Sequence, residues 1–301
     1  MLKTMGVYTA WLAVALGLPA ALATKAGAAE TPATVAPATV ATAPTGGVRV
    51  QSDVVWRTVD GEQLTLDAFV PERAEKSRPA VVLIHGGGWR AGTKANFDQQ
   101  GHDLAALGYV AFSINYRLAP EHPYPAAVDD VQAAVRWLRT PAQVERYGID
   151  PERIGALGGS AGAHLTGMLA TLGHGSLDHG ARIRAAVSWS GPMDLRVAGA
   201  TGPIPTFLGC IPSDPACADT AAAASPITYV DRTDAPLLLA NSDHELVPLR
   251  QAQEMDAAIT KAGVQHQLVV LPGTRHSRAY SNDIWDQTVT FFEQHLGSPK
   301  P

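Results

Sequence analysis

One short stretch of this chain restricts its possible folds more than any other. Residues 153–158 read as a buried strand, and residues 163–172 read as a helix. Between them, Gly158 and Gly162 bracket Ser160 in a G-x-S-x-G pattern, which allows a sharp reversal and leaves the serine hydroxyl accessible. Because such a turn also occurs in α/β proteins without chemistry, Ser160 is a candidate nucleophile that needs support from other residues.

A glycine run follows a second predicted strand. Residues 80–84 are continuously apolar, as expected of a strand covered on both faces, and the next five residues read His-Gly-Gly-Gly-Trp. Three glycines let backbone N–H groups approach a ligand closely. We expect the N–H groups of Gly87 and Gly88, with that of Ala161, to bind a developing oxyanion. A phosphate loop fits less well, because no Gly-Lys-Ser/Thr ending follows.

The remaining pattern alternates strands and helices over a chain whose length, 301 residues, permits a single α/β domain. Other strands are expected at residues 48–59, 63–70, 109–115, 185–189, 236–241 and 265–271, and helices at 95–107, 128–139, 250–262 and 282–296. Residues 195–228 form a Gly-, Pro- and Ala-rich excursion.

Three motifs together carry a family resemblance. The glycine run at residues 85–89, the proline-fixed loop at 116–127 and the serine turn at 158–162 resemble those of hormone-sensitive-lipase-like esterases and the related BD-FAE group of bacterial carboxylesterases. The resemblance covers residues 48–296. It implies an α/β-hydrolase fold, a mostly parallel central sheet flanked by helices on both faces, with no metal, no cofactor and activity on short-acyl carboxylic esters. Gly159 stands where the hormone-sensitive-lipase branch usually has Asp, which favours the BD-FAE side.

The resemblance implies an acid in the loop after the strand at residues 236–241, where two carboxylates compete. The family pattern has an Asp three residues before a Val-Pro pair, and counting back from Val247 reaches His244. Asp243 lies one residue earlier and Glu245 one later. We favour Asp243, and keep Glu245 as the alternative because its longer side chain can compensate for its position.

The predicted general base is His276, in the loop after the last strand. Ser160, then Asp243 or Glu245, then His276 reproduces the Ser, acid, His order of α/β-hydrolases. Asp194 is disfavoured as the acid because it follows a strand too early in the fold. Glu121 and His122 are expected to be structural, since their loop braces the glycine run.

The N-terminus reads as an export signal. Residues 1–29 combine Lys3, an apolar stretch at 5–18 and small residues suited to cleavage. An uncleaved membrane anchor is the alternative, disfavoured by the short apolar run and by Pro19. We predict a signal peptide at 1–29, a flexible Thr/Pro/Ala linker at 30–47, a catalytic domain at 48–301, and a secreted or periplasmic protein without stable membrane insertion after cleavage.

The cysteines, the histidines and the net charge limit which disulfide, metal site and binding partners the chain can have. In an exported chain, Cys210 and Cys217 most simply form one disulfide that stiffens a rim over the active site. His174 and His179 lack a third well-spaced ligand, so we predict no metal site there. A net charge of −5 without a basic run argues against nucleic-acid binding.

The sequence therefore predicts a secreted serine carboxylic ester hydrolase acting on a small-molecule or polymer-linked short-acyl ester. Two alternatives remain open. One is a related acyl hydrolase acting on an amide, a formamide, or acetylated or feruloylated polysaccharide. The other is a non-catalytic binding protein on a hydrolase fold.

Overall fold

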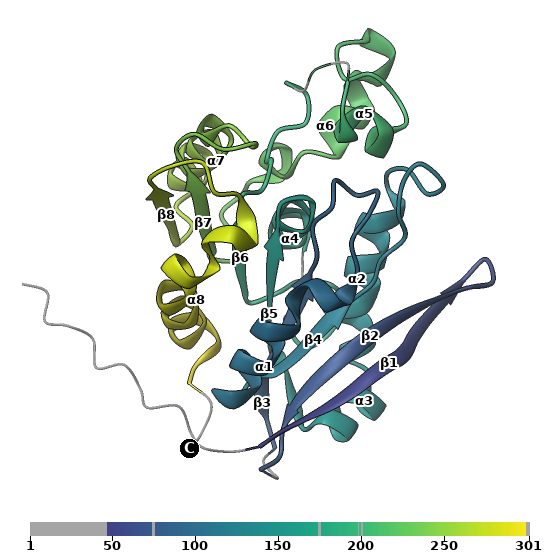
Figure 1. The fold of residues 1–301 in the computed structure, drawn as a ribbon, viewed down its shortest axis with the longest axis vertical. Helices are drawn as coiled ribbons and strands as arrows, with labels where there is room; N and C mark the ends of the chain where they lie inside the picture. The colour runs from purple at the N-terminus through teal and green to yellow at the C-terminus, as the bar shows by residue number, and fades with distance from the viewer. Residues whose placement is uncertain (1–46, 74–75, 174–175, 198, 200, 299–301) are drawn as a thin grey trace, which may run out of the picture. The chain divides into compact units, whose positions relative to one another are not determined.

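The structure is a computed structural model that describes residues 47–73, 76–173, 176–197, 199 and 201–298. The predicted signal peptide, and the predicted linker except Gly47, lie outside these residues. The described residues belong to the unit Thr42–Pro301. Strands and helices alternate along most of this unit (Figure 1), as the sequence pattern predicted.

Eight strands form one sheet in the order β1-β2-β4-β3-β5-β6-β7-β8. β1 and β2 pair antiparallel, as do β2 and β4, and all other neighbours are parallel. This confirms the predicted, mostly parallel sheet. The strands are β1 (Val48–Val59), β2 (Glu62–Pro71), β3 (Arg78–Ile84), β4 (Val110–Ile114), β5 (Ile149–Gly159), β6 (Ala185–Trp189), β7 (Leu237–Ser242) and β8 (His266–Leu271).

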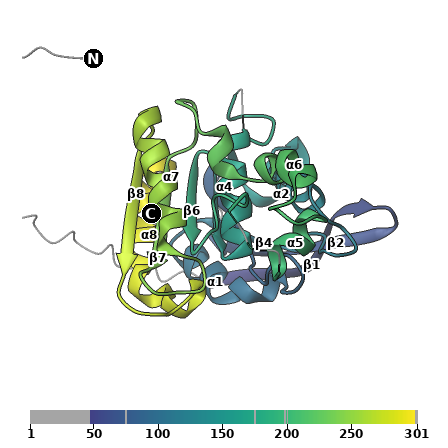
Figure 2. The same cartoon turned by 90° about the horizontal axis from the view of Figure 1, so that it is seen from above.

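Helices cover both faces of the sheet (Figure 2). Successive residues of a strand point to opposite faces, and β3 shows this: Val82 packs in the same core as α2, α4 and α7, whereas Val81 packs with α1 and α8. The helices are α1 (Asp98–Ala106), α2 (Ala126–Leu138), α3 (Pro141–Tyr147), α4 (Ala161–Leu172), α5 (Pro203–Leu208), α6 (Ala218–Ala223), α7 (Leu249–Ala262) and α8 (Ser281–Leu296).

The register of β3 against β5 positions the functional loops. Ile84, the last residue of β3, pairs with Gly158 near the end of β5. Parallel strands end at the same edge of a sheet. The glycine run that follows β3 and the serine that follows β5 are therefore neighbours at that edge.

Two regions hold more helix than the sequence predicted. α3 begins with Pro141 at its first turn, where the missing N–H costs nothing, and ends at Gly148 with φ 63°. Within the excursion at residues 195–228, α5 likewise begins at a proline, Pro203, and ends before Gly209 with φ 72°. Figure 1 shows α5 and α6 together at one end of the sheet.

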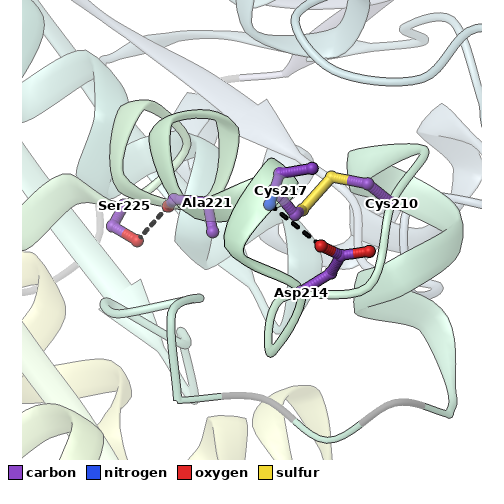
Figure 3. Close-up of a disulfide and its surroundings, with 6 residues drawn as sticks. Cys210, Asp214, Cys217, Ala221 and Ser225 are labelled. Atoms are coloured by element: carbon purple, nitrogen blue, oxygen red, sulfur yellow. Dashed lines mark hydrogen bonds between the residues drawn. A yellow bond between two sulfur atoms is a disulfide. The ribbon is translucent and has the colours of Figure 1, made fainter.

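The predicted disulfide joins the end of α5 to the start of α6 (Figure 3). Cys210 and Cys217 are bonded, with 5.7 Å between their Cα atoms, which confirms the prediction. The Cys217 N–H donates to the carbonyl of Asp214 at 2.8 Å, and Ser225 Oγ donates to the carbonyl of Ala221 at 2.7 Å. The bridge and the Cys217–Asp214 bond fix the loop between the two helices, and the Ser225–Ala221 bond closes the last turn of α6.

Candidate active site

Ser160 sits in the sharp turn that its flanking glycines make possible. Its φ is 55° and its ψ is −119°, an uncommon conformation for a residue with a side chain. The N–H of Ser160 donates to the carbonyl of Trp189 at 2.8 Å, which ties the turn to β6. A Cβ at Gly158 would lie 2.1 Å from the Gly162 carbonyl oxygen. The packing therefore excludes side chains on either side of the serine and holds its strained backbone.

The glycine run places unpaired N–H groups beside Ser160. Gly87 has a φ of 115°, and its carbonyl accepts the N–H groups of Arg90 and Ala91 at 3.2 and 3.1 Å, closing a turn. Within the described residues, the N–H groups of Gly87 and Gly88 have no acceptor. The N–H of Ala161, at the first turn of α4, cannot bond within its own helix. All three predicted donors are thus free around the serine.

The loop at residues 116–127 braces the glycine run, as expected. Tyr116 Oη donates to the carbonyl of His85 at 2.9 Å, and the two rings stack with centroids 4.3 Å apart. The N–H of Ala119 donates to the carbonyl of Trp89 at 2.8 Å. His122 lies 3.1 Å from Glu62 on β2, in a partly exposed pair, consistent with a structural role.

His164 is buried and links other parts of the site by hydrogen bonds, a role that was not predicted from the sequence. Trp89 Nε1 donates to its Nδ1 at 3.3 Å, and its Nε2 donates to the carbonyl of Ala224 at 2.7 Å. Burial lowers the pKa of His164 to about 4, opposed by the bond to Ala224. The ring is therefore neutral and joins the glycine run, α4 and the segment after α6. The sequence feature that could have indicated this role is the spacing of four residues between Ser160 and His164, because that spacing places both residues on one side of a helix.

His276 is paired with Glu245. Nδ1 of His276 hydrogen-bonds Oε2 of Glu245. The Glu245 side chain has no exposed surface, whereas that of His276 is 26% exposed. A carboxylate in this position fixes the tautomer and orientation of the imidazole. The structure therefore joins the predicted base to the alternative acid.

Asp243, the favoured acid, has other partners. Its Oδ1 lies 2.7 Å from His244 Nδ1 and accepts the N–H of Gly273 at 2.7 Å. These two bonds hold the pKa of Asp243 below its ordinary value. The N–H of Asp243 also donates to the carbonyl of Leu271, which extends the β7 to β8 pairing by one residue. The chain turns inward only after this point, so Glu245 reaches the imidazole and Asp243 stays at the surface.

A buried serine holds the other oxygen of Glu245. Ser190 Oγ donates to Glu245 Oε1 at 2.8 Å, and the N–H of Ser242 donates to the same oxygen at 2.8 Å. Ser190 Oγ in turn accepts the N–H of Ser277 at 2.8 Å and lies 2.7 Å from Tyr280 Oη. No role for Ser190 was predicted from the sequence, although this residue directly follows β6. The residue connects the acid to the segment that carries the base.

The other candidate residues lie outside this network. Asp194 is held by Arg196 at 2.7 Å; burial opposes its ionisation, but the hydrogen bonds from Arg196 keep its pKa below the ordinary value. His179 pairs with Asp178 at the surface, and His174 lies outside the described residues. No group of three potential metal ligands occurs in the described part of the chain.

Ser160 lies between two cavities. The first, of about 380 Å³, is lined mainly by apolar side chains such as those of Trp89, Pro192 and Ile204. The second, of about 710 Å³, is lined by Ser160, His276 and more polar residues. No hydrogen bond joins Ser160 to His276 in the described structure, but both residues line the second cavity. Such bonds are often long without substrate and shorten when it binds.

Comparisons with known proteins agree with this fold. The BD-FAE family model matches residues 66–259, more than half of the chain. An arylacetamide deacetylase from Oryctolagus cuniculus is 41% identical over 109 residues, covering 34% of this chain and 27% of the relative. The probable carboxylic ester hydrolase LipM from Mycobacterium tuberculosis is 31% identical over 217 residues, covering 66% of this chain and 49% of the relative. The chain thus spans about half or less of these relatives.

Solved structures show the same architecture. The esterase Est2 from Thermogutta terrifontis superposes with a TM-score of 0.68 at 25% identity, covering 85% of this chain and 95% of that one. The resemblance to BD-FAE carboxylesterases seen in the sequence agrees with the family match, with the serine turn and with the alternation of strands and helices. The chain belongs to the BD-FAE family and has the α/β-hydrolase fold.

Proposed function

We propose that this protein is a serine carboxylic ester hydrolase acting on short-acyl esters. The observation that carries the proposal is the pairing of His276 with buried Glu245 in a cavity that Ser160 also lines. The names of its relatives, a carboxylic ester hydrolase and an esterase among them, support the same reaction class.

His276 acts as the general base on Ser160. Glu245 accepts a hydrogen bond from Nδ1–H of His276, so Nε2 of the neutral ring carries the lone pair that removes the Ser160 proton. Ser160 Oγ then attacks the ester carbonyl and forms a tetrahedral intermediate. The N–H groups of Gly87, Gly88 and Ala161 stabilise its oxyanion, since they have no acceptor in the described structure.

Collapse of the intermediate releases the alcohol. His276 gives its proton to the leaving oxygen, and the acyl group remains on Ser160. Water, deprotonated by the same ring, then attacks the acyl carbonyl. The bond from the acyl carbon to Ser160 Oγ breaks, the carboxylic acid leaves, and His276 returns its proton to Ser160. The proposed triad is Ser160, His276 and Glu245, with Glu245 in the role first expected of Asp243.

The first cavity accommodates the acyl group. It is lined by Ser160 and Ala161, and apolar side chains form much of its wall. Its volume of about 380 Å³ lies near the lower end of the range for small-molecule pockets. These features support a short acyl chain.

We also propose that the protein is exported. The disulfide between Cys210 and Cys217 supports an oxidising compartment. The predicted signal peptide at residues 1–29 lies outside the described residues. In the described part of the chain, no helix has the length and apolar character needed to span a membrane.

Hydrolysis of 4-nitrophenyl acetate tests the proposed reaction. We expect turnover by the wild type and a loss of at least about 10³-fold in kcat for Ser160→Ala. Ser52→Ala is the matched control, because Ser52 is exposed on β1 and should retain full activity. Equal rates for Ser160→Ala and wild type would overturn the proposal. An aryl acetamide and acetylated xylan in the same assay separate amide and polysaccharide hydrolysis from the proposed reaction.

A further inference from the structure

The second cavity beside Ser160 has a charge pattern that the reaction alone does not require. It shares Gly88, Ser160, Pro203 and Leu246 with the first cavity, and it alone contains His276. Arg90 and Arg278 also line it. No Asp or Glu is among its described lining residues, although the chain as a whole carries a net charge of −5. The wall of this cavity is therefore a local positive region on an acidic protein.

In the described part of the chain neither arginine forms an ion pair with a carboxylate, and the carboxylates Asp103 and Asp286 line a separate cavity on another side of Arg278. Arg90 is exposed, and its guanidinium forms no hydrogen bond or ion pair with the described residues. The guanidinium of Arg278 donates to the carbonyl of Asn96, and its Cζ lies 6.0 Å from the centre of the Phe97 ring. These contacts orient Arg278 without removing its charge. Both cations are thus available to a ligand in the cavity.

The proposed chemistry determines which half of the substrate meets these cations. The imidazole that activates Ser160 must later protonate the leaving oxygen, so the alcohol half has to lie on the His276 side. His276 lines the second cavity and not the first. The acyl group therefore occupies the apolar cavity, and the alcohol half occupies the cavity with the arginines. This step rests on the proposed function.

We propose that the alcohol half of the preferred substrate carries a carboxylate that Arg90 and Arg278 bind. A guanidinium offers paired N–H donors that match the two oxygens of a carboxylate. A neutral alcohol would leave both charges without a partner, whereas a cationic one would be repelled by them. The two arginines are specificity-determining residues, and they take no part in the bond-making steps.

A matched pair of esters tests this inference on the full chain. In 4-acetoxybenzoate the leaving group is anionic, and in 4-acetoxybenzamide it is neutral with nearly the same shape. We expect the double variant Arg90→Gln/Arg278→Gln to lose about 5- to 20-fold in kcat/KM on the benzoate and less than about twofold on the benzamide. The loss on the benzoate should shrink at 0.5 M salt, because exposed charge pairs are screened.

The control removes the same charge elsewhere. Arg136 and Arg146 lie on α2 and α3 and line neither cavity. Their double Gln variant should hydrolyse both esters like the wild type. Equal losses on both esters in the Arg90/Arg278 variant, or none on the benzoate, would overturn the carboxylate preference while leaving the proposed hydrolase function intact. A wild-type protein that hydrolyses neither ester would instead overturn the function, and the preference with it.

Discussion

Ser190 Oγ lies 2.8 Å from Oε1 of Glu245, the carboxylate oxygen that does not bond His276. The same hydroxyl receives the N–H of Ser277, the residue after the base. One buried group therefore sets the position of the acid and of the chain segment that carries the base. This arrangement makes Ser190 a positioning residue for the proposed triad.

Ser190→Ala should lower kcat on 4-nitrophenyl acetate by about 10- to 100-fold, because hydrogen bonds to charged groups contribute about 1.5–3 kcal/mol. KM should change little, since Ser190 lines neither cavity. The control is Ser188→Ala on β6, two residues before Ser190, because Ser188 Oγ is buried without a hydrogen-bond partner in the described structure. Equal effects of the two substitutions, or a change in KM alone, would contradict the positioning role.

Amide substitutions distinguish the two candidate acids. Glu245→Gln should reduce kcat by about 10³- to 10⁴-fold, because the amide cannot stabilise the imidazolium. Asp243→Asn should change it less than about threefold, since Asp243 pairs with His244 and Gly273. The rates of both variants on 4-nitrophenyl acetate decide the matter. A large loss in Asp243→Asn beside a small one in Glu245→Gln would restore the assignment favoured from the sequence.

Gly159 is restricted by the loop that carries the base. A Cβ built at Gly159 would lie 2.3 Å from Ser277 Oγ. Gly159→Ala should therefore lower the free energy of unfolding by about 1–3 kcal/mol through overpacking. Adding Ser277→Ala should recover most of this loss, because it removes the contacting atom. Urea unfolding of the two single variants and the double variant measures the coupling, and strictly additive effects would exclude the contact.

The buried histidines should make the fold sensitive to acid. Burial lowers the pKa of His164, and likewise that of His85, from 6.5 to about 4, with a backbone hydrogen bond opposing the shift in each. Between pH 6.5 and 4 the unfolded chain binds more protons at these sites than the folded chain. Stability is therefore full above pH 6.5 and declines towards pH 4, by about 1–3 kcal/mol for each histidine.

Urea unfolding across this pH range checks the effect. In His164→Gln the amide can replace both hydrogen bonds but cannot titrate, so the fall in stability between pH 6.5 and 4 should be smaller than in the wild type. Carboxylates also contribute to acid unfolding, and the comparison of the two proteins cancels their share. An identical pH dependence in both would show that His164 does not contribute.

The sequence predicted the sheet and the serine turn well because both depend on local patterns. An apolar run such as residues 80–84 predicts a buried strand, and a glycine such as Gly158 predicts a tight turn, whatever the rest of the chain does. The pairing of His276 depends instead on how the six-residue loop at 243–248 turns after β7. Counting residues placed Asp243 and Glu245 equally near the expected position. A tertiary hydrogen bond from Ser190, together with a local one from the N–H of Ser242, selects Glu245.

Ser190 and His164 could not be assigned from the sequence for the same reason. Their partners lie 55 residues or more away along the chain. Their residue types, a serine and a histidine, occur in many surface positions. The side chains acquire a role only when β6, β7 and α4 come together.

The most direct test of the proposed mechanism is covalent labelling of the nucleophile. We predict that diethyl 4-nitrophenyl phosphate inactivates the protein and leaves one phosphoryl adduct per chain, found by peptide mass spectrometry on Ser160. His276→Gln should react far more slowly, because no base activates the serine. An adduct on a different residue, or full activity after prolonged exposure with Ser160 unmodified, would contradict the account.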